Sequence, residues 1–230
     1  MDEYSRAGAR EAYRRLMREK PEWFCNHPRG GITIVTSDAE VELASVQAGQ
    51  YRKAHGLVEM DLRPGVLARD AYMTVVRDAV RFPDGSYGLY NRIIESSPVA
   101  VLPLLRGRSV MMKVFRHGLR DWSLEFPRGG CDDGESYEAS AIRELKEEIG
   151  AKTLRLIPLG EFTPGGSSLS IRAHLFGAEI EGIGCGDALE GIEEVRAMEV
   201  VEVEHSISSG EIIDGFSLAL FTRARLANLI

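Results

Sequence analysis

Apolar positions along the chain follow two different spacings, one typical of helices and one typical of strands. Helical spacing, with apolar residues three and four positions apart, marks residues 2–20, 136–149 and 216–229. Short apolar or alternating runs predict strands at 32–35, 72–80, 87–94, 99–105, 109–115, 154–162, 170–180 and 195–203. Residues 40–58 match neither spacing. Strands placed before, between and after helices indicate an α+β chain in which helices cover a mixed sheet.

The strand-rich pattern begins at residue 71, and this sets the expected domain organisation. We expect residues 1–70 to form an N-terminal extension that contains a helix and a strand, and residues 71–230 to form the main domain. A chain of 230 residues is long enough for one large domain with a smaller appendage.

Charge and composition exclude several classes of function. The formal net charge is −7, and no basic run is present, so we expect no nucleic-acid partner. No apolar run approaches the ~20 residues of a membrane span, and the charged first twenty residues do not resemble a signal peptide. Cys25, Cys131 and Cys185 lie far apart, which favours reduced thiols in a cytoplasmic protein.

Residues 129–151 carry the strongest chemical signal, in the sequence GGCDDGESYEASAIRELKEEIGA. Ser136 can cap the start of a helix, and Gly150 stands where a left-handed cap would end it. The helical repeat places Ile142, Leu145 and Ile149 on one face, which we expect to be buried. It places three glutamates on another face, Glu144, Glu147 and Glu148.

Three carboxylates on one helical turn repel one another. One interpretation is a solvated acidic face, balanced by Arg143 and Lys146 nearby. The other is a binding site for Mg²⁺, which prefers carboxylate oxygens together with substrate phosphates and water.

The flanking residues resemble the Nudix hydrolase box, G-x5-E-x7-R-E-U-x-E-E-x-G-U, where U is aliphatic. The matching positions are Gly129, Glu135, Arg143, Glu144, Leu145, Glu147, Glu148, Gly150 and Ala151. The resemblance implies a mixed β-sheet sandwiched between helices in an α/β/α arrangement. It also implies that Glu144, Glu147 and Glu148 bind Mg²⁺, with Mn²⁺ as the alternative ion. Gly129, Glu135, Arg143 and Gly150 would then be structural parts of the box.

The residues before the box resemble the lead-in W-x-x-E-x-P-A-G of ADP-ribose and nucleotide-sugar pyrophosphatases. Here the lead-in runs from Trp122 to Gly129, and Arg128 replaces the usual alanine. The backbone carbonyl of Arg128 could still bind metal, and Glu125 would face the site. Arg116 stands where the subfamily has the arginine of Q-Y-R, so it is a candidate for substrate binding; the alternative is a surface arginine.

Two segments after the box extend the resemblance. Thr163–Ser168 is similar to the S-P-G-G-T-S loop of the same subfamily, which assigns Pro164, Gly165 and Gly166 to substrate binding. The glutamate that often follows this loop is absent. An acidic loop before the last predicted strand supplies candidates for the general base, Glu193 first and Glu190 second, with Glu147 of the box as a further candidate. A solvated turn is the alternative interpretation of that loop.

The resemblance implies Mg²⁺-dependent hydrolysis of the pyrophosphate bond in ADP-ribose or a nucleotide sugar, giving a nucleoside monophosphate and a phosphorylated partner. Two alternatives remain open: a pyrophosphatase for dinucleoside polyphosphates or NADH-type compounds, and a Nudix module that binds ADP-ribose without cleaving it. The subfamily is commonly homodimeric, so we expect a homodimer. We expect its ligand to be a small-molecule nucleotide substrate, and we expect no association with a membrane.

Overall fold

The computed structural model describes residues 6–184 and 191–230. Contacts between residues divide the chain into two compact units. The first comprises the described part of Met1–Glu95 together with Gly165–Ser170, and the second comprises Ser96–Pro164 with the described part of Ile171–Ile230. The division therefore falls at Glu95, after two strands that the sequence pattern joins to the main domain.

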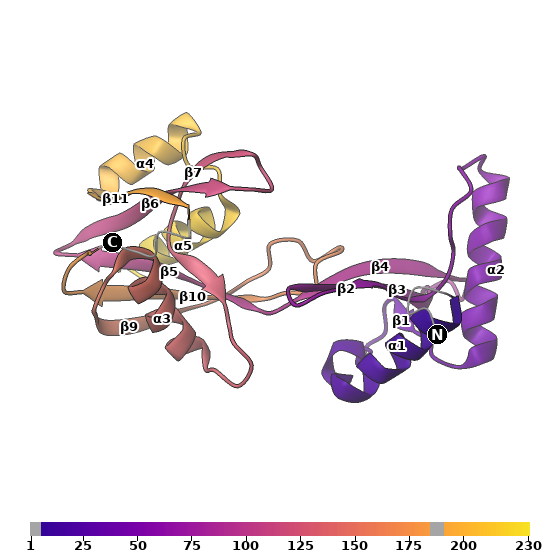
Figure 1. The fold of residues 1–230 in the computed structure, drawn as a ribbon. Helices are drawn as coiled ribbons and strands as arrows, with labels where there is room; N and C mark the ends of the chain where they lie inside the picture. The colour runs from indigo at the N-terminus through magenta and orange to yellow at the C-terminus, as the bar shows by residue number, and fades with distance from the viewer. Residues whose placement is uncertain (1–5, 185–190) are drawn as a thin grey trace. The chain divides into compact units, whose positions relative to one another are not determined.

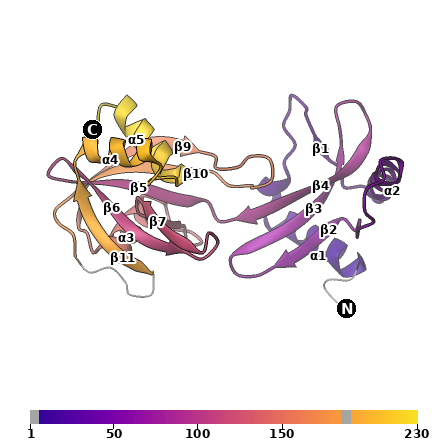
Figure 2. The same cartoon turned by 90° about the horizontal axis from the view of Figure 1, so that it is seen from above.

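The first unit is a small antiparallel sheet packed against two helices (Figure 1). Figure 2 shows β4, β3 and β2 side by side. One edge of β3 pairs with β4 over its whole length, and the other edge pairs with β2 and then with β1. Its elements are α1 (Arg6–Glu19), a 3-10 helix η1 (Pro21–Phe24), β1 (Thr33–Ile34), α2 (Asp38–Ala54), β2 (Gly65–Arg69), β3 (Met73–Arg81) and β4 (Tyr87–Glu95).

Two apolar clusters hold this unit together. Leu16 of α1 packs with Val76 and Ile94 of the sheet, and Ala44 of α2 packs with Ala79. The helix α2 occupies the stretch for which the apolar spacing gave no prediction. Ser37 caps its first turn, so the capping residue indicates this helix better than the spacing of its apolar residues does.

The second unit contains a seven-stranded mixed sheet. Its central order is β11-β6-β5-β10-β9, with β7 paired to β6 and β8 paired to β5. Only the pairing of β5 with β10 is parallel among the described strands. The elements are β5 (Pro98–Leu105), β6 (Arg108–Arg116), β7 (Asp121–Glu125), β8 (Arg128–Gly130), α3 (Tyr137–Ile149), β9 (Thr153–Phe162), β10 (Ala173–Ile180), β11 (Ile192–Met198), α4 (Val200–Ser209) and α5 (Gly215–Leu226).

Helices cover both faces of this sheet (Figure 1). Leu145 and Ile149 of α3 pack on one face with Met112 of β6. Val203 of α4 and Leu220 of α5 belong to the cluster on the other face. The α+β fold with a mixed sheet sandwiched between helices is therefore confirmed.

Two details of the expected pattern are wrong. The strand predicted at 195–203 ends at Met198, and the helix α4 begins at Val200. The backbone amide of Glu199 donates to the Glu202 carboxylate at 2.7 Å in a capping box, which starts a helix despite the β-branched valines. Ile142 is 45% exposed, whereas Leu145 and Ile149 are fully buried.

Two further features of composition can be compared with the structure. Cys25 and Cys131 are free thiols, and Cys185 lies outside the described residues. Among the described helices, none combines the length and the apolar character that crossing a membrane requires.

Candidate active site

The helix α3 begins and ends where its capping residues predict. The hydroxyl of Ser136 accepts a hydrogen bond from the Ala139 amide at 3.2 Å. Gly150 adopts a left-handed conformation with φ of 60°, and its amide donates to carbonyls of the last turn. These two caps fix which residues of the acidic helix face the sheet.

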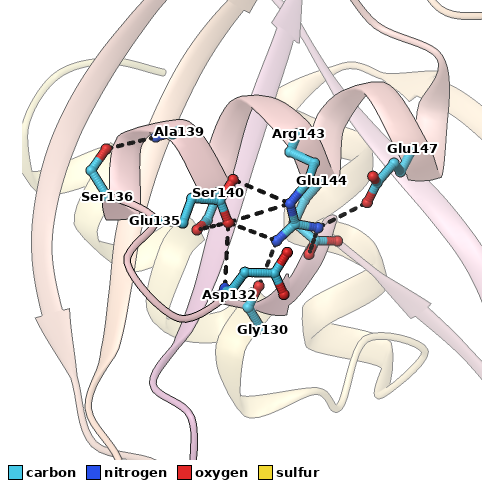
Figure 3. Close-up of polar contacts among 9 residues, drawn as sticks. All are labelled: Gly130, Asp132, Glu135, Ser136, Ala139, Ser140, Arg143, Glu144 and Glu147. Carbon is cyan, nitrogen blue, oxygen red and sulfur yellow. Dashed lines mark hydrogen bonds and ion pairs between the residues drawn. The ribbon is translucent and has the colours of Figure 1, made fainter.

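Arg143 ties this helix to the loop that precedes it (Figure 3). Its guanidinium donates to the carbonyl of Gly130 at 2.7 Å and to the carboxylate of Glu135 at 3.1 Å. It also donates to Glu144 at 2.7 Å and to Glu147 at 2.8 Å. The hydrogen bonds to Glu135 are the largest of the effects that raise the pKa of Arg143. The guanidinium of Arg143 thus positions both the preceding loop and two of the candidate metal ligands, Glu144 and Glu147.

Gly129 lies against the carboxylate of Glu144. A β-carbon built on Gly129 would come within 2.2–2.3 Å of that carboxylate, a distance no real contact allows. A larger residue at this position would therefore force the Glu144 carboxylate or β8 to move.

The three box glutamates are not equivalent. Glu144 and Glu148 are 8% and 3% exposed, whereas Glu147 is exposed. The amide of Arg128 donates to the Glu148 carboxylate at 2.9 Å. Two carboxylates one turn apart are therefore held in the interior beside β8, and the third lies at the surface.

Glu125 is the centre of a second charged group in this unit. It is 1% exposed and accepts from Arg116 at 2.6 and 3.0 Å and from Arg128 at 3.1 Å. Burial alone would raise the pKa of Glu125, but the two arginines outweigh burial and lower it. Burial would lower the pKa of Arg116, but Glu125, Glu148 and Asp214 raise it instead. The charges of Arg116 and Glu148 thus act on each other within one site.

Three residues at the start of α5 complete this site, and the sequence analysis did not assign them a role there. Asp214 caps the helix and lies 3.7 Å from the guanidinium of Arg128. The same guanidinium lies 4.5 Å from the ring centroid of Phe216. The hydroxyl of Ser217 accepts from the amide of Phe126 at 3.0 Å. An N-capping aspartate before an apolar run was the available signal.

The structure does not bring every expected residue to this site. Glu193 lies at the surface, and its carboxylate pairs with Lys113 at 2.5 Å. Lys113 follows Met111 in the alternation of β6, and Met111 packs on the face opposite to Met112 and α3. Glu190 lies outside the described residues.

The proposed substrate loop is divided between the units. Pro164 belongs to the second unit, and Gly165 and Gly166 belong to the first. The backbone after them is bound to β4, because the amide of Ile93 donates to the carbonyl of Ser168 at 2.8 Å.

The donor atoms fit a hard divalent cation. Glu144 and Glu148 provide buried carboxylate oxygens, and Arg128 provides a backbone carbonyl, all of the type that Mg²⁺ prefers. Among the described residues, no three His, Cys, Asp or Glu side chains converge into a preformed metal site. Instead, Arg143 bridges Glu144 and Glu147.

A family model described as the NUDIX domain matches residues 97–216, which is more than half of the chain. The chain belongs to the NUDIX family. The match begins one residue after the boundary between the two units and includes α3 with both of its flanking segments.

Several relatives within the NUDIX family carry related names. An ADP-sugar pyrophosphatase of Mus musculus is 44% identical over 59 residues, which cover 24% of this chain and 27% of the relative. An ADP-ribose pyrophosphatase of Bacillus subtilis is 32% identical over 101 residues, which cover 44% of this chain and 55% of the relative. The ADP compounds hydrolase NudE of Escherichia coli is 31% identical over 86 residues, which cover 36% and 46%. The chain thus spans between about a quarter and about half of these relatives.

A solved structure of an ADP compounds hydrolase has the same fold. It superposes with a TM-score of 0.63 at 20% identity and covers 70% of this chain and 89% of that one. At this identity the likeness supports the fold alone.

Proposed function

We propose that this NUDIX chain is a Mg²⁺-dependent pyrophosphohydrolase that cleaves ADP-ribose or a nucleotide sugar. The products would be a nucleoside monophosphate and a phosphorylated partner. The names of the mouse and Bacillus subtilis relatives support this substrate class.

The observation that carries the proposal is the pair of buried carboxylates on α3. Glu144 and Glu148 lie one turn apart, almost without solvent, where like charges destabilise a helix. Such an arrangement favours binding of a divalent cation. The absence of a side chain at Gly129 leaves room for the Glu144 carboxylate beside β8.

In the proposed site, Glu144, Glu147, Glu148 and the carbonyl of Arg128 would hold Mg²⁺ or Mn²⁺. The bound ion would neutralise phosphate charge and lower the pKa of a water molecule. Arg116 would bind a substrate phosphate, since its side chain is only partly buried and Glu125 fixes the position of its guanidinium. Arg128 would add positive charge to the same position.

A carboxylate would take the proton from the attacking water. Glu147 is paired with Arg143, but it is the candidate that the geometry favours because it lies on the same turn of α3 as the buried pair. Glu193 is held by Lys113, whose strand position faces away from α3. Glu190 stays a candidate from the sequence.

A substrate panel tests the proposed activity. The full chain with Mg²⁺ would be incubated with ADP-ribose, ADP-glucose, a diadenosine polyphosphate and NADH, and release of AMP would be measured. We expect the highest kcat/KM for ADP-ribose or ADP-glucose, with Glu148→Gln as the inactive control. The proposed chemistry is wrong if the folded protein with Mg²⁺ releases no AMP from any of the four compounds. Preference for the diadenosine compound or NADH would assign the chain to that class instead.

We also propose that two copies of the chain associate in solution, as the resemblance implies. The chain mass is 25.4 kDa, so sedimentation equilibrium distinguishes a dimer from a monomer directly. A mass equal to one chain at micromolar concentration would exclude the dimer.

A further inference from the structure

The first unit contains a pocket of about 370 Å³ between α1, β3 and the segments around β1 and β2. This volume lies at the lower end of the range of roughly 300–1,000 Å³ found for small-molecule sites. Its inner wall includes apolar residues such as Met17, Val35 and Val41. No acidic side chain lines it among the described residues, but four arginines do: Arg10, Arg14, Arg18 and Arg77.

Three of these arginines form a row along α1. Arg10, Arg14 and Arg18 are spaced four residues apart, so they lie above one another on one side of the helix. Like charges at this spacing destabilise a helix, just as the glutamates of α3 do. A row of this kind therefore gains stability when an anion lies beside it.

The carboxylates of the protein neutralise only part of this charge. Arg10 and Arg14 share a single oxygen of Asp38, at 2.6 and 2.5 Å. The carboxylate of Glu11 lies 3.5 Å from Arg18 and 4.0 Å from Arg14. Both carboxylates are more than half exposed, so solvent screens these pairs.

Arg77 adds a buried positive charge. It is 7% exposed, and its guanidinium donates to the amide oxygen of Asn91 at 2.9 Å and to the carbonyls of Asp61 and Arg63. All of these acceptors are formally neutral, and burial lowers the pKa of Arg77. The charge of Asp61 raises the pKa of Arg77, but Asp61 is itself paired with Arg63 at 3.0 Å. The four lining arginines and the two carboxylates paired with them, Asp38 and Glu11, therefore leave two positive charges in excess at the pocket.

We propose that this pocket binds a small organic phosphate, with the phosphate beside Arg10 and Arg14 and an apolar body against Met17 and Val41. A phosphomonoester carries a charge of roughly −1.5 to −2 at neutral pH, which matches the excess. A guanidinium also binds two phosphate oxygens at once, and two adjacent guanidinium groups define the orientation of the ligand. The site is separate from the NUDIX segment, because every lining residue lies before residue 97.

Phenyl phosphate is a suitable probe because it combines an aromatic body with a phosphomonoester. Calorimetry on the full chain in EDTA would compare it with inorganic phosphate and with phenol. We expect phenyl phosphate to bind about tenfold more tightly than inorganic phosphate, and phenol to give no measurable binding. Equal binding of phenyl phosphate and phenol would overturn the proposal, since charge would then have no role.

Matched variants locate the binding. Arg14→Gln should weaken binding of phenyl phosphate about tenfold or more, and Arg14→Lys should recover part of the loss because it restores the charge. Arg15→Gln is the control, since Arg15 lies on the same helix and does not line the pocket. An equal loss in Arg14→Gln and Arg15→Gln would overturn the proposal.

Arginine side-chain NMR separates the two candidate sites of the protein. We expect phenyl phosphate to shift the Nε–H signals of Arg10 and Arg14. Shifts confined to Arg116 and Arg143 would place the ligand in the NUDIX segment and overturn the proposal. Because EDTA is present throughout, the result does not depend on the hydrolase activity.

Discussion

At the scale of single residues, the contact between Gly129 and Glu144 makes a sharp prediction. Gly129→Ala places a methyl group within 2.2–2.3 Å of the Glu144 carboxylate, so that carboxylate or the strand must move. We expect kcat to fall about 100-fold, because a displacement of 1 Å at a site of this kind has an effect of that order. The loss of stability should be about 1–3 kcal/mol, as in other overpacked interiors.

Gly118→Ala is the matched control for this substitution. An added β-carbon at Gly118 meets nothing within 4 Å, and the backbone there does not have a positive φ. Steady-state kinetics and urea unfolding of both variants give the comparison. Similar kcat values for Gly129→Ala and the wild type would show that the close approach has no role in activity.

The identity of the general base gives a second prediction at this scale. Glu147→Gln should reduce kcat about 100-fold or more, in the range typical of general-base catalysis, and Glu193→Gln should change it less than about threefold. The reason is that Glu193 is paired with Lys113, away from α3. The pH profile of kcat is the second readout, since removal of the base should abolish its acidic limb. The reverse order of effects would assign the base to the loop before β11.

Single residues also show what a sequence pattern can and cannot predict about the site. The box spacing assigned Arg143 and Glu135 to structural positions, and in the structure their side chains form an ion pair at 3.1 Å. Asp214 could not be assigned to the site, because its approach to Arg128 brings together segments far apart in the chain. Spacing in sequence predicts contacts within an element and not those between elements.

At the scale of secondary structure, the two isoleucines of α3 should differ in their effect on stability. Ile149→Ala should destabilise the protein by about 2–5 kcal/mol, because Ile149 is fully buried. Ile142→Ala should change stability by less than about 0.5 kcal/mol, because Ile142 is 45% exposed. Urea unfolding followed by circular dichroism measures both. A loss at Ile142 as large as that at Ile149 would contradict the burial described for α3.

Strands and helices with buried apolar residues were predicted more accurately than those marked mainly by capping residues. The strands β5 and β6 were predicted within one residue at each end, because their apolar runs are buried in the sheet. The strand β4 was predicted equally well although most of its residues are only partly buried. The helix α2 was missed, because capping and terminal charges mark it more clearly than apolar spacing does. The first four residues of α4 were predicted as the end of a strand, because valine is typical of strands. The prediction did not take the capping glutamates Glu199 and Glu202 into account.

At the scale of the whole molecule, the two units have separate apolar cores, so we expect them to respond separately to a core mutation. Asp78 is 1% exposed and pairs with Arg92 at 2.5 Å in the first unit. Asp78→Asn leaves that arginine without a charge partner, and we expect a loss of about 3 kcal/mol in the first unit. The hydroxyl of Tyr13 also donates to Asp78, so α1 should loosen with the sheet.

Hydrogen exchange followed by mass spectrometry tests this separation. We expect faster exchange in peptides from β3 and β4 of the Asp78→Asn protein, and unchanged exchange in β5 and α3. Arg81→Gln is a suitable control, because Arg81 is exposed at the end of β3. Uniformly faster exchange in both units would show that the molecule opens as one cooperative body.

The segment Gly165–Ser170 belongs to the first unit, so the polypeptide leaves the second unit after Pro164 and returns to it at Ile171. Deleting the codons for the first 95 residues would therefore not isolate the second unit alone. The segment Gly165–Ser170 would remain, and it would lose its backbone hydrogen bonds to Ile93. For the same reason, replacing the second unit with that of a related protein requires the exchange of two separate gene segments, which encode residues 96–164 and 171–230.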